Sequence, residues 1–285
     1  MMSLNNITVN IPVLNEEKNI KDCILSIKKS GIKKIIVIDG GSTDQTVNIL
    51  KRLKVKIILA KKRGLAYQRN LGIKNTTTKF VALIDADMRA TKNSFKLMLK
   101  DLEDSIYAGV EAKIKTANSK KNYFDNAYQE IMNININKQG IRRMIGTPTL
   151  WKSRILKFNN FDPFFTGPSD DTDLCYRIYK KGYLFSGSSA IIKHVHRSSF
   201  AEYFKKYIWY GKGDAQFVQK HPERFLSIIK HQLFNYPIKF SFHAILRNRA
   251  IYIPFMIFAG YLRFIGMNYE LILRALKTKD KIYST

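Results

Sequence analysis

Two aspartates, Asp85 and Asp87, directly follow the apolar run at residues 80–84. Carboxylates placed this close repel one another, so the arrangement costs stability unless a cation neutralises them. Mg²⁺ binds one or two carboxylates and completes its shell with water and substrate phosphate oxygens. We therefore expect Asp87 to bind a metal that carries a diphosphate, and Asp85 to contact the sugar or base of a nucleotide. The alternative is that the pair only caps a helix beginning near Thr91.

A second acidic group crowds the start of a predicted helix and consists of Asp170, Asp171 and Asp173. The positive end of a helix dipole stabilises such charges, so simple capping is one interpretation. The other is that one carboxylate acts as a general base, kept ionised by the helix N-terminus and neighbouring cations. Arg177 stands four residues after Asp173 and could pair with it along the helix.

A glycine turn follows Asp39, whose carboxylate could accept a hydrogen bond from a base imide N–H. Gly40 and Gly41 allow a sharp turn and a close approach of the backbone to a ligand. Ser42 and Asp44 are candidates for capping the next helix, whose N-terminus favours anions. The segment lacks G-x-G-x-x-G spacing, which argues against a dinucleotide.

His194 and His196 alternate, so on a strand both side chains face the same side. They could join Asp87 around one metal, contact a leaving diphosphate, or serve only the structure.

Strands and helices alternate through the first part of the chain. The segments 7–13, 33–41, 55–60 and 79–87 read as strands, and 16–31, 42–53 and 64–75 as helices. This alternation predicts a mainly parallel sheet with helices on both faces, in which ligands bind beyond the carboxyl ends of the strands. Asp39, Asp85 and Asp87 should therefore meet at the ligand edge. Farther along, 106–114 reads as a strand, 120–139 as a helix, and 144–156 and 182–196 as segments that contain strands.

The chain is strongly basic, with 49 Lys and Arg against 22 Asp and Glu, a formal net charge of +27. Such a chain favours anionic partners, which include nucleic acid, anionic lipid and phosphorylated substrates. Cys23 and Cys175 form no C-x-x-C pair and are expected to be buried free thiols in a reducing compartment. The opening residues lack the pattern of a secretory signal, so we expect cytosolic chemistry.

The last part of the chain is aromatic and basic. Residues 250–262 are uncharged but too short to cross a bilayer, and adding 263–267 reaches spanning length with Arg263 inside the run. One true span, a helix lying in the interface, and a soluble core helix all remain open. Basic residues beside aromatic ones suit an anionic lipid surface. The stripe from Phe200 to Gly211 also fits simple packing against another element.

Taken together, these motifs resemble the family 2 glycosyltransferases, which have the GT-A fold. The resemblance covers roughly residues 5 to 215 and rests on the order and spacing of "IPVLNEEKNI", "VIDGGSTDQT", "RGLAYQRNLGI", "LIDADM", "DDTDLCYR" and "HVHRSSFAEYFKKYIWYGKG". It implies a metal-dependent, inverting transfer of a sugar from a nucleoside diphosphate to a hydroxyl group. The expected fold is α/β, a GT-A (Rossmann-like) sheet flanked by helices, with a helical, membrane-associated appendage. The expected domains are a catalytic domain over 1–198, whose nucleotide-sugar half is about 1–104 and whose acceptor half is about 105–198, and a tail over 199–285.

The resemblance also assigns roles by position. The nucleotide-sugar pocket would be lined by Pro12, Asn15, Glu16, Asp39, Gly41, Arg69 and Asp85. Asp87 would bind Mg²⁺ or Mn²⁺, with His194 and His196 as further candidate ligands. Asp171 matches the second residue of the family's Glu-Asp pair and would be the base, while Asp170 stands where the family usually has Glu. Trp209 and Tyr210 would lie on the acceptor side. Gly40 replaces a second Asp that is common in the family, which would remove one polar contact to the nucleotide.

The expected partners are a UDP- or GDP-sugar, a lipid-linked or glycan acceptor, and the anionic cytoplasmic face of the membrane. The tail would attach there peripherally or through a single segment. Three other classes fit the sequence less well. A nucleic-acid-binding protein fits the charge, but the cations are spread along the chain and the carboxylates would repel a phosphate backbone. A sugar nucleotidyltransferase would show a glycine-rich phosphate loop near the N-terminus, and an inactive membrane scaffold would not need the acidic set.

Overall fold

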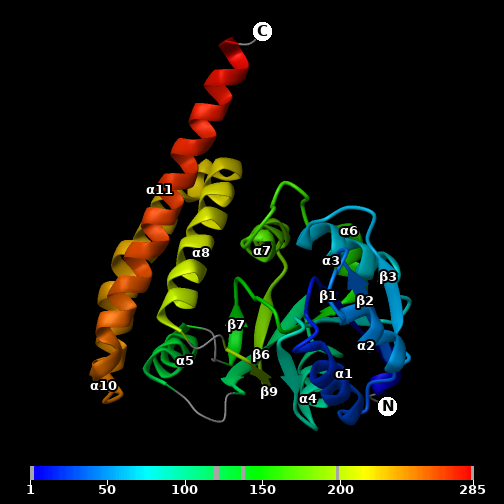
Figure 1. Cartoon of the computed structure of the whole chain (residues 1–285). Coiled ribbons are helices and arrows are strands. Elements are labelled where there is room, and N and C mark those ends of the chain that lie inside the picture. The colour runs from blue at the N-terminus through cyan, green and yellow to red at the C-terminus, as the bar shows by residue number, and fades with distance from the viewer. Residues whose placement is uncertain (1–2, 118–121, 136–138, 197–198, 284–285) are drawn as a thin grey trace. The chain divides into compact units, whose positions relative to one another are not determined.

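The computed structural model describes residues 3–117, 122–135, 139–196 and 199–283, with side chains as far as residue 276. It separates into two compact units (Figure 1). The sheet unit comprises Met1–Ser119, Asn135–Thr166 and Asp171–His196, and the helical unit comprises Lys120–Ile134, Gly167–Asp170 and Arg197–Thr285. The predicted domain boundary at residue 198 and parts of the predicted helix 120–139 lie outside the described residues. The helical unit also includes two segments that were expected in the acceptor half.

The sheet unit is built on one mixed sheet whose described strands follow the order β3-β2-β1-β4-β8-β6-β9-β5, with β7 paired to β9. The strands are β1 (Ile7–Val13), β2 (Lys34–Asp39), β3 (Lys56–Leu59), β4 (Phe80–Leu83), β5 (Met88–Ala90), β6 (Gly109–Thr116), β7 (Gly140–Arg142), β8 (Thr149–Lys152) and β9 (Phe185–His194). The four strands from the first part of the chain pair in parallel, as predicted. Beyond β4 the sheet turns antiparallel through β8, and β6 and β9 again pair in parallel.

Helices cover both faces of this sheet, because alternate residues of each buried strand point to opposite sides. Phe80 and Ala82 share a core with α1 (Ile20–Lys29), α2 (Thr46–Arg52) and α4 (Ser94–Leu102). Val81 and Leu83 share the other core with α3 (Leu65–Lys74), α6 (Ser153–Phe158) and α7 (Asp170–Lys180). The short helix η1 (Leu4–Asn6) precedes β1. Both cysteines are buried and free, as predicted.

Strand register sets the depth of each side chain relative to the ligand edge. One row of partners crosses the sheet at the level where β4 ends, and it consists of Asn10, Leu83, Thr149, Glu111 and Gly187. Val13 and Asp39 form the last pair of β1 and β2. Since β4 ends at Leu83, Asp85 and Asp87 lie just beyond its carboxyl end.

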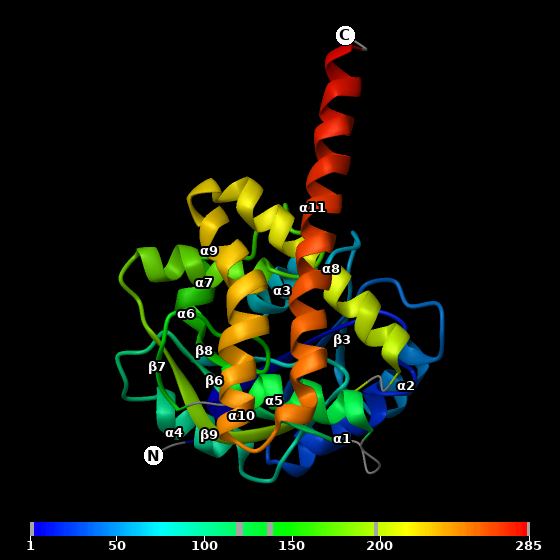
Figure 2. The same cartoon turned by 90° about the vertical axis from the view of Figure 1, so that its left-hand side faces the viewer.

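The helical unit contains long helices packed on one another. Its elements are α5 (Tyr123–Asn135), α8 (Phe200–Lys220), η2 (Pro222–Arg224), α9 (Phe225–Lys230), the π-helix η3 (His231–Phe240), α10 (Ser241–Leu246), η4 (Ala250–Tyr252) and α11 (Ile253–Tyr283). Helix α8 begins with a capping box between Ser199 and Glu202. A Cβ atom on Gly211 would collide with the carbonyl of Arg263, and one on Gly266 with that of Ile208. Glycine at these positions therefore lets α8 and α11 pack backbone to backbone. Figure 2 shows α10 and α11 side by side.

Arg263 lies within the apolar run of α11 but does not face an apolar environment. Its guanidinium forms a two-point ion pair with Asp214 of α8, with 2.7 Å between Nη2 and Oδ1. Gln232 of η3 donates to the same carboxylate over 2.8 Å. The buried charge is thus compensated inside the helical unit, as buried charges must be.

Candidate active site

Asp39 ends β2 and is 2% exposed. Its carboxylate accepts hydrogen bonds from the N–H groups of Gly41 (3.0 Å) and Ser42 (3.1 Å), and from the Ser42 hydroxyl (2.5 Å). Gly41 has a φ of +93°, a left-handed conformation that glycine adopts without strain. The carboxylate therefore fixes the shape of the turn at the ligand edge.

The loops after β1 and β2 hold each other in place. Ser42 accepts from the N–H of Asn15 at 2.9 Å, and Asn15 Oδ1 accepts from the N–H of Thr43 at 2.8 Å. The N–H of Glu16 donates to Thr46 Oγ1 over 2.8 Å. Asn15 has a φ of +56°, a conformation that asparagine tolerates better than most residues. Pro12 lies near the end of β1 and pairs in register with Ile38.

The structure corrects part of the predicted capping of α2. The N-cap residue is Gln45, and Ser42 is used in the turn and the β1 loop instead. Asp44 still accepts from the N–H of Thr46 at 2.9 Å, so it supports the first turn of the helix from outside.

Helix α3 delivers Arg69 to the same edge. Gln68 donates to the carbonyls of Val13 (2.9 Å) and Ile38 (2.8 Å), which ties the helix to the ends of β1 and β2. Arg69 is buried, lies 3.7 Å from the Asp85 carboxylate and has its guanidinium over the ring of Phe161. It thus places a fixed positive charge beside the aspartate pair.

Asp87 and His194 lie together, which the hypothesis of a shared metal site requires. Asp87 Oδ2 is 3.2 Å from His194 Nε2, and the N–H of Val195 donates to the carbonyl of Asp87. The Nδ1 atoms of His194 and His196 are 2.9 Å apart. Within the described ranges, no set of three or more His, Cys, Asp or Glu forms a complete metal cage. The carboxylate and imidazole donors do fit a divalent ion that takes its other ligands from phosphate and water.

The three aspartates at the start of α7 lie in different environments. Asp173 is fully buried and pairs with Arg177 at 2.8 Å, as the spacing predicts. Asp170 is 2% exposed and belongs to the helical unit. Asp171 belongs to the sheet unit, is half-buried, and accepts from the N–H of Thr172 over 2.7 Å. Asp171 is therefore the more accessible carboxylate of the pair.

Glu111 is a candidate residue that the sequence motifs did not single out. It is 4% exposed on β6, pairs with Arg142 at 2.8 Å and accepts from the N–H of Gly146 at 2.8 Å. A Cβ atom on Gly146 would lie 3.2 Å from Asp171 Oδ2 and 3.6 Å from Glu111 Oε1, so both carboxylates flank this segment. Burial raises the pKa of Glu111 to about 8, and the charge of Asp171 adds to the rise, against the opposing effects of Arg142 and the Gly146 N–H. The only sequence signal was a glutamate inside the predicted strand 106–114.

Three residues of the sheet unit form hydrogen bonds with the segment around Gly146. Glu111 binds the Gly146 N–H, the thiol of Cys175 donates to the carbonyl of Ile145 over 3.2 Å, and Arg69 donates to Thr147 Oγ1 over 3.3 Å. The segment therefore connects the surroundings of Asp171 with the arginine beside Asp85.

Trp209 and Tyr210, the predicted acceptor-side residues, belong to the helical unit. Trp209 is 44% exposed. Tyr210 packs edge to face on Tyr207 and lies beneath the guanidinium of Arg263. Tyr210 therefore helps to hold the core of the helical unit.

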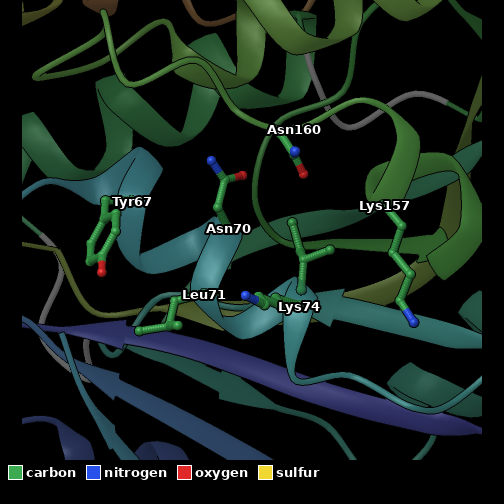
Figure 3. A pocket seen from close by; sticks show the side chains of 7 residues that line it. Tyr67, Asn70, Leu71, Lys74, Lys157 and Asn160 are labelled. Atoms are coloured by element: carbon green, nitrogen blue, oxygen red, sulfur yellow. The ribbon is translucent and has the colours of Figure 1, made fainter. Parts of the chain in front are cut away.

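A pocket of about 490 Å³ opens between α3 on one side and α6 with the chain that follows it on the other (Figure 3). Its lining residues are Tyr67, Asn70, Leu71, Ile73, Lys74, Lys157 and Asn160. None of them belongs to the predicted site. Asn70 exchanges two hydrogen bonds with the backbone of Phe161, which holds the chain under Arg69. The convergence of Arg69 with the carboxylates, rather than this pocket, defines the candidate active site.

The sequence matches the family described as "Glycosyl transferase family 2" over residues 8–167. This match covers more than half of the chain, and it contains all of β1 except Ile7, the strands β2 to β8, Asp39, Arg69 and the Asp85–Asp87 pair. The chain belongs to this glycosyltransferase family and is a transferase enzyme.

Several curated proteins are similar to the chain. An uncharacterized glycosyltransferase of Rickettsia conorii is 29% identical over 166 residues, which cover 54% of this chain and 28% of that protein. The chain thus matches little more than a quarter of that relative's length. A Methanococcus voltae protein is 26% identical over 247 residues, covering 76% of this chain and 75% of that protein. Its name is dolichyl N-acetyl-alpha-D-glucosaminyl phosphate 3-beta-D-2,3-diacetamido-2,3-dideoxy-beta-D-glucuronosyltransferase.

Solved structures share the fold. Mycobacterium tuberculosis glucosyl-3-phosphoglycerate synthase, in complex with Mg²⁺ and UDP, superposes with a TM-score of 0.56 at 15% identity and covers 75% of this chain and 78% of that chain. Residues 1–349 of S. aureus TarS superpose with a TM-score of 0.54 at 17% identity and cover 95% of this chain and 91% of that chain. These likenesses confirm the predicted α/β GT-A fold.

Proposed function

We propose that the protein transfers a sugar from a nucleoside-diphosphate sugar to a hydroxyl acceptor, with inversion at the anomeric carbon. The observation that carries the proposal is the meeting of Asp85 and Asp87 with Arg69 and His194 at the carboxyl edge of the sheet. A carboxylate pair between a guanidinium and an imidazole is suited to a metal–diphosphate group. The nucleotide would lie along Pro12, Asn15, Glu16, Asp39, Gly41 and Arg69.

The donor that fits best is a UDP-sugar, with a GDP-sugar as the alternative. The support is that the structurally similar M. tuberculosis synthase has been solved with UDP and Mg²⁺, and with UDP, Mn²⁺ and glucosyl-3-phosphoglycerate. Asp87 and His194 would hold the divalent ion. His196 would lie beside them, because its Nδ1 contacts Nδ1 of His194. When bound, such an ion stabilises the negative charge of the departing diphosphate. Arg69 adds a second, permanent positive charge near the same carboxylates.

Asp171 is the proposed general base. It accepts the proton of the acceptor hydroxyl as the oxygen attacks the anomeric carbon, while the bond between that carbon and the diphosphate oxygen breaks on the opposite face. Its half-buried position at the start of α7 supports this assignment over Asp170, which is nearly inaccessible.

The proposed acceptor is carried by a lipid or belongs to a cell-envelope glycan, and the protein works at the cytoplasmic face of the membrane. Three observations support this part of the proposal. The net charge is +27, the M. voltae relative is named for a dolichyl-phosphate-linked substrate, and Ala250–Leu276 is long and apolar enough to cross a membrane by length and composition.

The test is a screen of UDP-, GDP- and dTDP-sugars for thermal stabilisation of the full chain, with and without Mn²⁺ or Mg²⁺. We expect one nucleotide class to raise the melting temperature only when the metal is present, because the metal links Asp87 to the diphosphate. Absence of any shift with all three classes would overturn the proposed donor site.

Glu223→Gln is a suitable control for this screen, because Glu223 is an exposed carboxylate of the helical unit. It should respond to nucleotide and metal as the wild type does. Asp87→Ala should abolish the metal-dependent part of the shift.

A further inference from the structure

The run from α9 to α10 is apolar on two opposite faces. Its inward face buries Tyr236, Phe240 and Ala244, together with Gln232, which donates to Asp214. Its outward face exposes Phe234 (46%), Ile238 (54%), Phe242 (59%) and Ile245 (53%). The outward residues recur every three or four positions, so they form one continuous stripe along the helix. A water-facing helix would carry polar side chains at these positions.

Helix α11 has the same property. Met256, Ala259 and Met267 are buried on the face that packs against the other helices of the unit. On the other side, apolar and tyrosine side chains are exposed over six successive turns at Ile257, Tyr261, Ile265, Tyr269, Ile272 and Leu276. We call the two stripes together the outer apolar face. In Figure 2 α10 and α11 lie side by side, so the stripes belong to neighbouring helices.

Positive charge accompanies this face. Residues 225–249 contain Lys230, Lys239, Arg247 and Arg249 and no Asp or Glu. All four side chains are exposed, but Arg247 forms an ion pair with Glu130 of α5, so the charge of this face rests on Lys230, Lys239 and Arg249. The Lys230 ammonium lies 5.9 Å from the ring centre of Phe234. Apolar and aromatic side chains edged by lysine and arginine are typical of surfaces that bind anionic lipid.

The packing of α11 argues that the face lies on a membrane and that the helix does not cross it. Arg263 is committed to Asp214 of α8, and Gly266 is in backbone contact with Ile208. Helix α11 could enter hydrocarbon only together with α8, which carries six charged residues, namely Glu202, Lys205, Lys206, Lys212, Asp214 and Lys220. Charged side chains are costly at the bilayer centre, so the stable arrangement keeps α8 in water.

We propose that the outer apolar face docks in the plane of an anionic membrane, with its aromatic and aliphatic side chains in the headgroup boundary and its cations on the phosphates. A second copy of this chain fits the face less well. A symmetric pair would bring Lys230, Lys239 and Arg249 of the two copies together, and residues 225–249 contain no carboxylate to compensate them. This inference rests on the membrane location in the proposed function, but it does not depend on the transfer chemistry, so vesicle binding and nucleotide-sugar transfer can fail separately.

The test uses the purified full chain and vesicle co-sedimentation. We expect binding to vesicles that contain phosphatidylglycerol, weaker binding to pure phosphatidylcholine, and weakening by salt. The triple variant Phe234→Ser/Ile238→Ser/Phe242→Ser should bind at least ~10-fold more weakly, because each substitution removes apolar area from the contact. Its circular dichroism and melting temperature should match the wild type, since all three side chains are exposed.

The matched control is Leu59→Ser/Ile106→Ser/Phe158→Ser, which removes three exposed apolar side chains from the sheet unit (67%, 79% and 86% exposed). It should bind vesicles as the wild type does. Equal binding by the outer-face variant and the wild type would overturn the proposal, as would equal binding to neutral and anionic vesicles. Retention on vesicles after alkaline carbonate washing would overturn the in-plane arrangement in favour of a span. A dimer that the outer-face variant converts to a monomer, without vesicle binding, would assign the face to a second copy.

Discussion

Asp87 and His194 face each other where β5 begins and β9 ends, with 3.2 Å between the carboxylate oxygen Oδ2 and the imidazole nitrogen Nε2. The register accounts for this contact, because Met88 pairs with His194 in the antiparallel β5–β9 ladder. An acidic residue after one strand is thus joined to a histidine more than a hundred positions later. The pair combines a carboxylate, which binds Mg²⁺ and Mn²⁺, with an imidazole, which suits transition-metal ions better than Mg²⁺.

The first prediction concerns this pair. His194→Ala should raise the Mn²⁺ concentration needed for half-maximal stabilisation by UDP by ~10-fold or more, because one ligand or its close partner is lost. Isothermal titration of Mn²⁺ into the UDP-saturated protein measures the change directly. His243→Ala removes a histidine from α10 and should leave the titration as it is in the wild type. An unchanged titration in His194→Ala would remove His194 from the metal site.

Asp171→Asn should lower kcat for sugar transfer by ~10²-fold or more, because the variant cannot accept the acceptor proton. Nucleotide affinity should stay near the wild-type value, since Asp171 is assigned to the acceptor hydroxyl. Initial rates with a responsive donor and titration with the nucleoside diphosphate separate the two effects. Sugar transfer by Asp171→Asn at a near wild-type rate would show that Asp171 is not the base.

Asp170→Asn is the natural comparison for that experiment. Asp170 is almost completely buried, so its substitution should act mainly on stability. A loss of kcat in Asp170→Asn with full activity in Asp171→Asn would exchange the two roles.

Glu111→Gln should change how stability depends on pH. The pKa of this carboxyl rises from an ordinary value of 4.5 to about 8 on folding, mainly because of burial. The folded protein therefore holds a proton that the unfolded chain releases, and the stabilising contribution is lost as the pH rises from about 5 to 8. Urea unfolding should show a free energy of unfolding that falls over this interval in the wild type, by up to ~1.4 kcal/mol per pH unit.

The amide that replaces the Glu111 carboxyl in this variant cannot titrate, so the stability curve of the variant should be flatter over the same pH interval. Glu223→Gln, which replaces an exposed carboxylate, should follow the wild-type curve. Parallel curves for the wild type and Glu111→Gln would contradict the raised pKa.

Asp214→Asn should destabilise the helical unit by ~3–5 kcal/mol, because it leaves the buried guanidinium of Arg263 without its counter-charge. The double variant Asp214→Leu/Arg263→Met should cost less than the sum of the single changes, since it removes both charges together. Denaturant unfolding of the wild type, Asp214→Leu, Arg263→Met and the double variant closes the double-mutant cycle and gives the coupling energy. Strict additivity would show that the ion pair is not coupled.

The sequence by itself determined the local elements and the residues that end them. Period-two and helical patterns predicted the parallel half of the sheet, the helix that carries Arg69, and the position of Asp85 and Asp87 just past a buried strand. Local spacing also predicted the pairing of Asp173 with Arg177, because residues four apart on a helix are neighbours. The family followed from the same motifs, since their order along the chain is a property of the sequence.

Only the tertiary structure decided which distant residues meet. Glu111, Gly146 and Asp171 come from β6, the loop before β8 and α7, and no local periodicity relates their positions. Arg263 reads from the sequence as a charge inside an apolar run, but the fold supplies Asp214 from another helix. In the same way, α5 as far as Ile134 belongs to the helical unit because its side chains contact that unit. For example, the hydroxyl of Tyr203 on α8 donates to Asp125 on α5. Long-range contacts depend on how whole faces pack together, and neighbouring residues in the chain carry little information about that choice.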